Sequence, residues 1–167
     1  CLARLVLYLN SIGDEGVVAL IDGLRGNESL RKLNLSFCDI SDEGAITLSS
    51  LLMDSSHLET LDLINNQIGG AGWIALANSL KYNQNLRHLS ISSCYKYSRA
   101  NFEDAFIPAF ENNVTLLQLD GIESSKIEAI MLRNKEKIPT AVRSAALLLI
   151  GIRRSTDSEG MGDFAGF

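Results

Sequence analysis

Residues 58–68 of this 167-residue chain read LETLDLINNQI, and this stretch decides the fold. Leucine stands at its first, fourth and sixth positions, asparagine at the ninth and isoleucine at the eleventh. Residues 2–12 (LARLVLYLNSI) and 30–40 (LRKLNLSFCDI) repeat this pattern, and residues 86–96 (LRHLSISSCYK) begin it again. Successive copies are 28 residues apart. Four copies of a multi-position pattern at one period indicate a repeat architecture.

A fifth copy follows, and the sequence allows two registers for it. A step of 28 residues would open it at Val114, and a step of 30 would open it at Leu116. We favour the longer step, because it places Phe106 and Phe110 where earlier repeats carry helical leucines. It also aligns Asn113 with two asparagines that precede the opening leucines of earlier repeats.

Each unit combines a short strand with a helix. The alternating leucines predict a strand whose leucine side chains all point inward. The asparagine that follows is placed to form hydrogen bonds with backbone groups at the turn. Leucine pairs four residues apart predict helices over 14–25, 42–53 and 70–81. We expect Ser41 to cap the second helix. We expect Asn27 and Asn83 to take the left-handed conformation at helix ends.

The units resemble the ribonuclease-inhibitor-like class of leucine-rich repeats. The resemblance rests on the 28-residue period, on the alternation of asparagine and cysteine at the turn, and on the sequences GDEG (13–16), SDEG (41–44) and GGAG (69–72). It implies an α/β solenoid shaped as a horseshoe arc, with about five repeats, parallel strands on the concave face and helices on the convex face. It further implies a cytoplasmic scaffold for a protein partner, without a catalytic site.

The domain organisation follows from where the pattern holds. Residues 1–133 form the predicted array, 134–154 a helix that caps its open end, and 155–167 a flexible tail or linker rich in glycine and serine. Because Cys1 lies within a repeat, we expect the chain to be a piece of a longer protein.

Residues between the core leucines are expected to point out of the concave sheet and to form three columns. The first is Arg4, Lys32, Thr60, His88 and Gln118, the second is Val6, Asn34, Asp62, Ser90 and Asp120, and the third is Tyr8, Ser36, Ile64, Ser92 and Ile122. Leu9, Phe37, Asn65 and Ser93 are expected to border them. Because interfaces favour aromatic residues and arginine, the predicted partner contacts are Arg4, Tyr8, Lys32, Phe37, Asp62 and His88. Of these, Lys32, Phe37 and Asp62 are expected to be exposed. The irregular stretch at 95–110 adds Tyr95 and Tyr97, since breaks in repeat regularity often carry binding loops.

Composition argues against several other functions. A net charge of −5 does not favour nucleic acid as a partner, and no apolar run approaches the length of a membrane span. Three cysteines and two histidines occur without metal-ligand spacing, so we expect no metal, no cofactor and no small-molecule substrate. Cys38 is assigned to the core, and Trp73 and Ile74 to packing. One alternative stays open, in which the array is the GTPase-activating or substrate-recognition part of a larger enzyme or effector.

Overall fold

The computed structural model describes residues 2–54, 57–91, 99–121 and 124–137. The chain divides into two units, Cys1–Asn134 and Lys135–Phe167, and every described strand belongs to the first. The sequence-predicted capping helix and tail lie outside the described residues, apart from residues 134–137.

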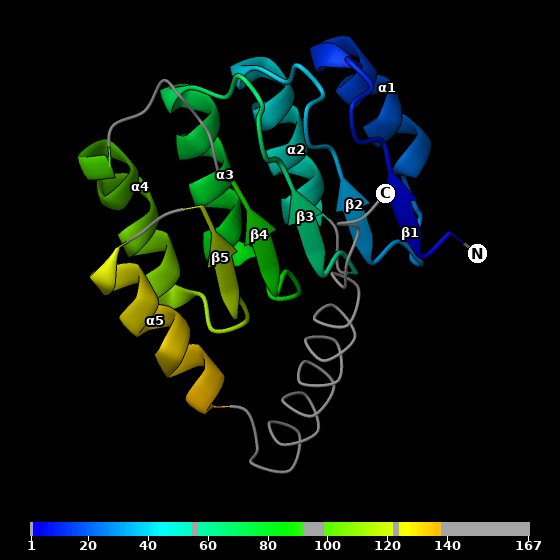
Figure 1. The fold of residues 1–167 in the computed structure, drawn as a ribbon. Coiled ribbons are helices and arrows are strands. Elements are labelled where there is room, and N and C mark those ends of the chain that lie inside the picture. Colours follow the sequence, from blue (N-terminus) through cyan, green and yellow to red (C-terminus); the bar gives the residue numbers. More distant parts are fainter. Residues whose placement is uncertain (1, 55–56, 92–98, 122–123, 138–167) are drawn as a thin grey trace, which may run out of the picture. The chain divides into compact units, whose positions relative to one another are not determined.

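Five short strands form one parallel sheet in chain order (Figure 1). The strands are β1 (Arg4–Val6), β2 (Lys32–Asn34), β3 (Thr60–Asp62), β4 (His88–Ser90) and β5 (Gln118–Asp120). The central leucines of neighbouring strands, Leu5, Leu33, Leu61, Leu89 and Leu119, align with one another. The sequence pattern therefore predicted both the strands and their register.

A helix follows each strand. The helices are α1 (Gly13–Leu24), α2 (Asp42–Asp54), α3 (Gly70–Tyr82), α4 (Arg99–Asn112) and α5 (Ser125–Glu136). Figure 1 shows α1 to α4 side by side along one face of the sheet. The first three begin and end within one residue of the predicted bounds, because leucine spacing defines a helix well and, in α1 and α2, acidic residues occupy the first turn.

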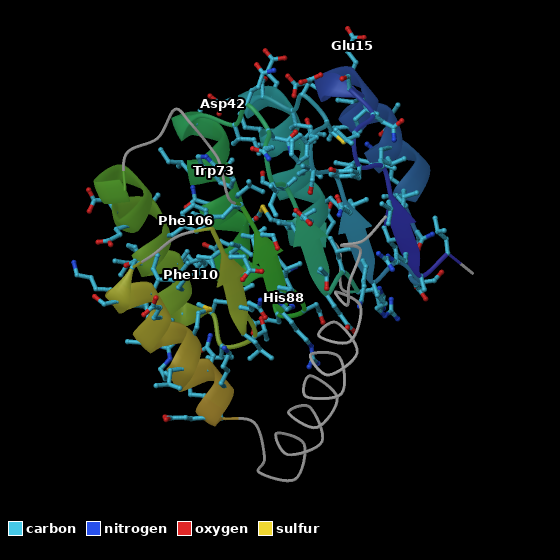
Figure 2. All side chains as sticks on the ribbon, in the orientation of Figure 1. Glu15, Asp42, Trp73, His88, Phe106 and Phe110 are labelled. Carbon is cyan, nitrogen blue, oxygen red and sulfur yellow. The ribbon has the colours of Figure 1, made fainter. Side chains whose placement is uncertain are left out.

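The register of the fifth repeat follows the 30-residue step. Leu89 pairs with Leu119, and Leu116 is fully buried. Phe106 and Phe110 are also fully buried, with ring centroids 5.2 Å apart. Trp73 of α3 lies 6.1 Å from Phe106, so aromatic rings fill the core between α3 and α4 (Figure 2).

Three further residues, Cys38, Trp73 and Ile74, were expected to be packed inside the protein, and the structure confirms this for two of them. Cys38 and Trp73 are buried, as predicted. Ile74 is about half exposed, so its assignment to packing was wrong. The reason is its place on the helix: Trp73, Leu76 and Leu80 occupy the buried face of α3, and Ile74 falls on the opposite side.

Asn66 ties the third repeat to the second. Its Nδ2 donates to the carbonyls of Leu35 (2.8 Å) and Leu63 (2.9 Å). Its Oδ1 accepts from the amides of Cys38 and Ile40, each at 3.1 Å. The amide thus uses all four of its hydrogen-bonding positions while buried. In the preceding repeat, the Cys38 thiol instead donates to the Leu7 carbonyl at 3.1 Å.

A second set of asparagines sits where each helix returns to the next strand. The Oδ1 of Asn27, Asn83 and Asn113 accepts from backbone amides two and three residues ahead. The expected left-handed backbone was wrong for Asn27 and Asn83: Asn83 is extended, with φ −68° and ψ 126°, and Gly26 takes the positive φ before Asn27. The asparagine works through its side chain, which forms an Asx turn.

The N-termini of α2 and α3 are capped from the preceding repeat. Asp14 accepts from the Ser41 amide (2.8 Å), the Ser41 hydroxyl and the Gly44 amide (2.9 Å). Asp42 repeats this for Gly69 (2.7 Å) and Gly72 (2.9 Å). Ser41 therefore stands at the expected place, but its hydroxyl donates to Asp14, and the capping oxygens belong to Asp14.

This arrangement affects the ionisation of Asp14. Burial alone would raise the pKa of the Asp14 carboxyl, but the three hydrogen bonds from Ser41 and Gly44 outweigh it and lower the pKa below its ordinary value. Gly44 permits the contact, because a Cβ at that position would collide with the Asp14 carboxylate and with Ile40. The spacing of aspartate and glycine in the repeat thus has a structural cause.

No helix within the described ranges is both long enough and apolar enough to cross a membrane.

Candidate protein-binding face

One face of the sheet points away from the helices, and we call it the outer sheet face. Its first column is Arg4, Lys32, Thr60, His88 and Gln118, and its second is Val6, Asn34, Asp62, Ser90 and Asp120. Both columns were predicted, since alternate side chains of a strand point to opposite faces. The core leucines occupy the other face.

The second column is largely engaged in hydrogen bonds of its own. The Asp62 carboxylate accepts from Asn34 Nδ2 (3.2 Å), Ser36 Oγ (2.6 Å) and the Ile64 amide (3.1 Å). Asp62 is therefore half-buried, and the expectation that it is exposed was wrong. Ser36, expected to point outward in the third column, is also buried, because its hydroxyl is held by Asp62.

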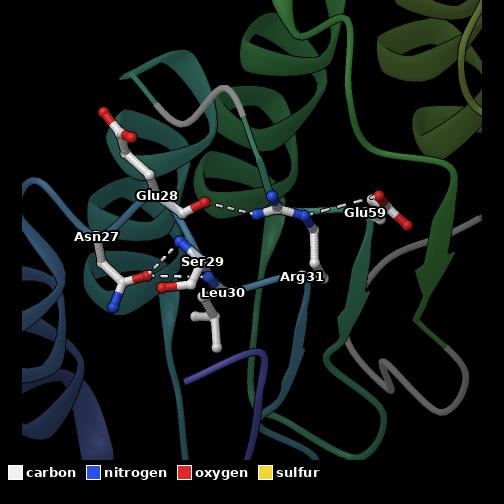
Figure 3. A network of polar contacts seen from close by, with 6 residues as sticks. All are labelled: Asn27, Glu28, Ser29, Leu30, Arg31 and Glu59. Atoms are coloured by element: carbon white, nitrogen blue, oxygen red, sulfur yellow. Dashed lines mark hydrogen bonds and ion pairs between the residues drawn. The ribbon is translucent and has the colours of Figure 1, made fainter. Parts of the chain in front are cut away.

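The first column supplies cationic side chains that are accessible. Arg4 and Lys32 are exposed on adjacent strands, and His88 is half-buried on β4 (Figure 2). Neither Arg4 nor Lys32 is held by an ion pair within the described residues. Arg31 differs: its Nη1 donates to the Glu28 carbonyl at 2.7 Å, and its Nε lies 3.9 Å from Glu59 (Figure 3). Arg4 and Lys32 are thus the cations open to a partner.

An aromatic pair lies just beyond the ends of β1 and β2. Tyr8 and Phe37 meet edge to face, with centroids 5.4 Å apart, and remain 46% and 38% exposed. Phe37 and Leu9 both have positive φ, at 55° and 61°. Their amides donate to Ile64 and Ser36 carbonyls, respectively, and these bonds hold the backbone there. Residues other than glycine rarely adopt a positive φ. The hydrogen bonds to the neighbouring repeats therefore hold Leu9 and Phe37 in a backbone conformation that leaves their apolar side chains exposed.

These residues form one surface, which we call the basic–aromatic patch: Arg4, Val6, Tyr8, Leu9, Lys32 and Phe37. Four of them were predicted contacts. The sequence reasoning did not select Val6 or Leu9, although Leu9 is 61% exposed. Leu9 was expected to border the columns together with Phe37, one 28-residue step later, but only Phe37 was selected as a contact. The predicted contacts Tyr95 and Tyr97 lie outside the described residues.

Metal-ligating side chains do not gather on this face. Within the described ranges, no group of three or more histidine, cysteine, aspartate or glutamate side chains could hold a metal ion. Cys38 lies in the core, where burial raises the pKa of its thiol. The face carries exposed cations, aromatic rings and apolar side chains, together with the hydrogen-bonded polar and acidic residues of the second column.

Comparison with known proteins agrees with the repeat geometry. A leucine-rich-repeat family model matches residues 1–20, 26–49 and 54–77. This match and the parallel strand-and-helix units of the structure together identify the kind of repeat. The chain carries leucine-rich repeats and has the α/β leucine-rich-repeat fold.

Two solved structures share the fold of this leucine-rich-repeat protein. One is described as "Leiomodin-1 Actin-Binding Site 2 (ABS2)", with a TM-score of 0.75 and 19% identity, covering 92% of this chain and 88% of that chain. The other is a Caenorhabditis elegans tropomodulin C-terminal domain, with a TM-score of 0.73 and 20% identity, covering 86% of this chain and 88% of that chain. No curated protein matches by sequence. At these identities, the likeness shows the fold alone.

Proposed function

We propose that this leucine-rich-repeat protein is a non-catalytic scaffold of the ribonuclease-inhibitor-like class. It works in the cytoplasm and binds a folded protein through the outer sheet face. The observation that carries the proposal is the basic–aromatic patch, where two cations that form no ion pair with any described residue adjoin an exposed aromatic pair. Aromatic residues and arginine dominate the energetics of protein interfaces.

The patch is also suited to binding because much of it is fixed beforehand. Tyr8 and Phe37 pack against each other, and hydrogen bonds to the next repeat fix the backbone at Leu9 and Phe37. Ordering a side chain on association costs about 0.5–1.5 kcal/mol. Groups already ordered in the free protein avoid much of this cost.

The charge of the patch indicates the kind of surface that it fits. Arg4 and Lys32 make it locally basic, although the chain carries a net charge of −5. A partner with an acidic rim around an apolar centre would match it, since complementary potentials favour encounter and specificity.

The proposal is tested by affinity capture from cytosol with a charge-matched pair of variants. The test variant carries Arg4→Glu, Lys32→Glu and Tyr8→Ala on the outer sheet face. The control carries Arg25→Glu, Lys81→Glu and Tyr82→Ala, all exposed residues on the helical side. We expect a protein that the wild type and the control retain and the test variant loses. Equal retention by all three would exclude the patch as the binding site.

Actin is a second candidate partner, favoured by the leiomodin-1 structure, whose title names an actin-binding site. Cosedimentation with actin filaments and a polymerisation assay with labelled monomers test this directly. Actin binding that the outer-face variant loses would identify the partner. Absence of any effect on actin would remove this candidate and leave the scaffold proposal to the capture experiment.

A further inference from the structure

The side of the helices that faces away from the sheet carries a column of apolar residues that the core does not use. Val18, Ile46 and Ile74 stand one 28-residue step apart, at the same position of α1, α2 and α3. Their exposed fractions are nearly equal, at 47%, 46% and 49%. Figure 1 shows α2 lying between α1 and α3. Ile46 is therefore exposed in the middle of the array, so the exposure of the column is not an effect of its ends.

The surroundings of the column on α2 and α3 are uncharged. One helical turn after Ile46 the exposed residue is Ser50, and one turn after Ile74 it is Asn78. Ala71, three residues before Ile74, is also exposed. The solvent-facing side of an amphipathic helix ordinarily carries polar and charged residues. Contiguous apolar surface of this kind marks an interaction site.

Two glutamates border one side of the column. Glu15 precedes Val18 by three residues and Glu43 precedes Ile46 by three, so each glutamate shares the face of its helix with the apolar residue. Both glutamates are exposed, and neither forms an ion pair with any described residue. Figure 2 shows Glu15 at the N-terminal end of α1, pointing away from the protein. The edge of the column is therefore acidic on α1 and α2.

The overall charge of these helices has the same sign. Three aspartate and glutamate residues lie in α1 and three in α2, whereas the basic residues of α1 to α3 amount to Lys81 alone. Arg25, just after α1, is already paired with Asp22 at 3.1 Å. The outer sheet face instead presents the cations Arg4 and Lys32. Since complementary charge favours encounter and specificity, the two sides of the array suit different partners.

The spacing of the column indicates the shape of the partner. The axes of packed helices lie about 8–10 Å apart, and this is the step from one apolar residue of the column to the next. On an α-helix, residues seven positions apart share one face and are separated by about 10.5 Å along the axis. In an extended segment, residues on one face recur every 6.6–6.8 Å or so, which fits the step less well. A helix laid across α1, α2 and α3 can place one apolar residue on each.

We propose that Val18, Ile46 and Ile74, with Glu15 and Glu43 beside them, bind a cationic amphipathic helix of a partner protein. Apolar residues at steps of seven along that helix contact the column. Lysine or arginine residues on one flank of the helix meet the two glutamates. The site uses none of the residues of the basic–aromatic patch and is independent of the function proposed for the outer sheet face.

A synthetic peptide tests the proposal with the full chain. The labelled probe is a helical peptide of about 22 residues with three leucines seven positions apart, lysines on one flank of the first two leucines, and alanine or glutamine elsewhere. The control peptide has the same composition, but its leucines are spread around the helix. Fluorescence anisotropy measures the Kd of each peptide, and circular dichroism confirms that each protein variant is folded.

The apolar contact is tested by the double variant Ile46→Ser, Ile74→Ser. Both positions are exposed, and serine has about the helix propensity of isoleucine, so the variant should fold. We expect it to weaken binding of the probe by about tenfold or more. The matched control is Val114→Ser, Leu132→Ser, which changes two exposed apolar residues outside α1 to α3 and should leave the Kd within about twofold.

The charged contact is tested by Glu15→Gln, Glu43→Gln. We expect this variant to weaken binding by about threefold at low salt and to reduce the dependence of the Kd on salt. Its control, Glu111→Gln with Glu136→Gln, removes two exposed glutamates from α4 and α5 and should change neither. The variant with Arg4→Glu, Lys32→Glu and Tyr8→Ala should bind the probe as the wild type does, which separates this site from the outer sheet face.

Three results would overturn the proposal. The two peptides could bind alike or not at all. The Ile46→Ser, Ile74→Ser variant could keep the wild-type Kd for the probe. The full chain could form a dimer in sedimentation velocity that Ile46→Ser abolishes, which would assign the column to a second copy instead.

Discussion

Replacing Asn66 with alanine should destabilise the array strongly, because the asparagine serves four backbone groups at once. The change leaves the carbonyls of Leu35 and Leu63 and the amides of Cys38 and Ile40 without their partner. A buried polar group left unsatisfied costs about 1–3 kcal/mol. Some of these groups will bond water that enters the space, so we expect a loss of about 3–5 kcal/mol in the free energy of unfolding. That is a large part of the roughly 5–15 kcal/mol that stabilises a typical domain.

Asn10→Ala is the matched control, since Asn10 occupies the same position of the first repeat. Asn10 is exposed and makes two bonds, to Leu7 and Tyr8, so its loss should cost no more than about 1 kcal/mol. Urea unfolding followed by circular dichroism and by the fluorescence of Trp73, the single tryptophan, measures both variants. Equal midpoints for Asn66→Ala and Asn10→Ala would refute the idea that these amides join the repeats.

The remaining predictions concern the core, the helix caps and the patch. Leu61→Asp should abolish the cooperative melt in circular dichroism, because it buries a charge without a partner in the centre of the sheet; an unchanged melt would contradict the register. The folded pKa of Asp14 is lowered, so its contribution to stability is present above the ordinary carboxyl pKa of 3.8 and is lost as pH falls through the folded value. The stability difference between wild type and Asp14→Asn should therefore shrink in acid, and a difference independent of pH would count against the cap. At Phe37, whose φ is 55°, glycine should be more stable than alanine by about 1 kcal/mol in urea unfolding; alanine equal to glycine would show that the backbone is unstrained.

The sequence predicted those features that depend on period and alternation. Strand register, the first two surface columns and the helix bounds all follow from leucines at fixed spacing, and the structure confirms them. The 30-residue step of the fifth repeat was also recoverable, because Phe106 and Phe110 fill the core as leucine does.

Features that depend on contacts between repeats were missed or wrong. The cap of α2 comes from Asp14, 27 residues before Ser41, and nothing in the local sequence marks that partner. Ser36 was expected outside, but the Asp62 carboxylate on the next strand holds it inside. The pattern within one repeat predicts on which face of the sheet a side chain lies. Whether that side chain is buried depends on the residues of the next repeat that contact it.

Site-specific photo-crosslinking tests directly whether the outer sheet face is the binding surface. A photoreactive amino acid replaces Tyr8 or Lys32 on that face, or Ile74 or Tyr82 on the helical side, and each chain is irradiated in cytosol. We expect both sheet positions to cross-link to one common protein and neither helical position to do so. Cross-links from Ile74 or Tyr82 with none from Tyr8 or Lys32 would contradict binding through the outer sheet face and would assign the binding surface to the helices.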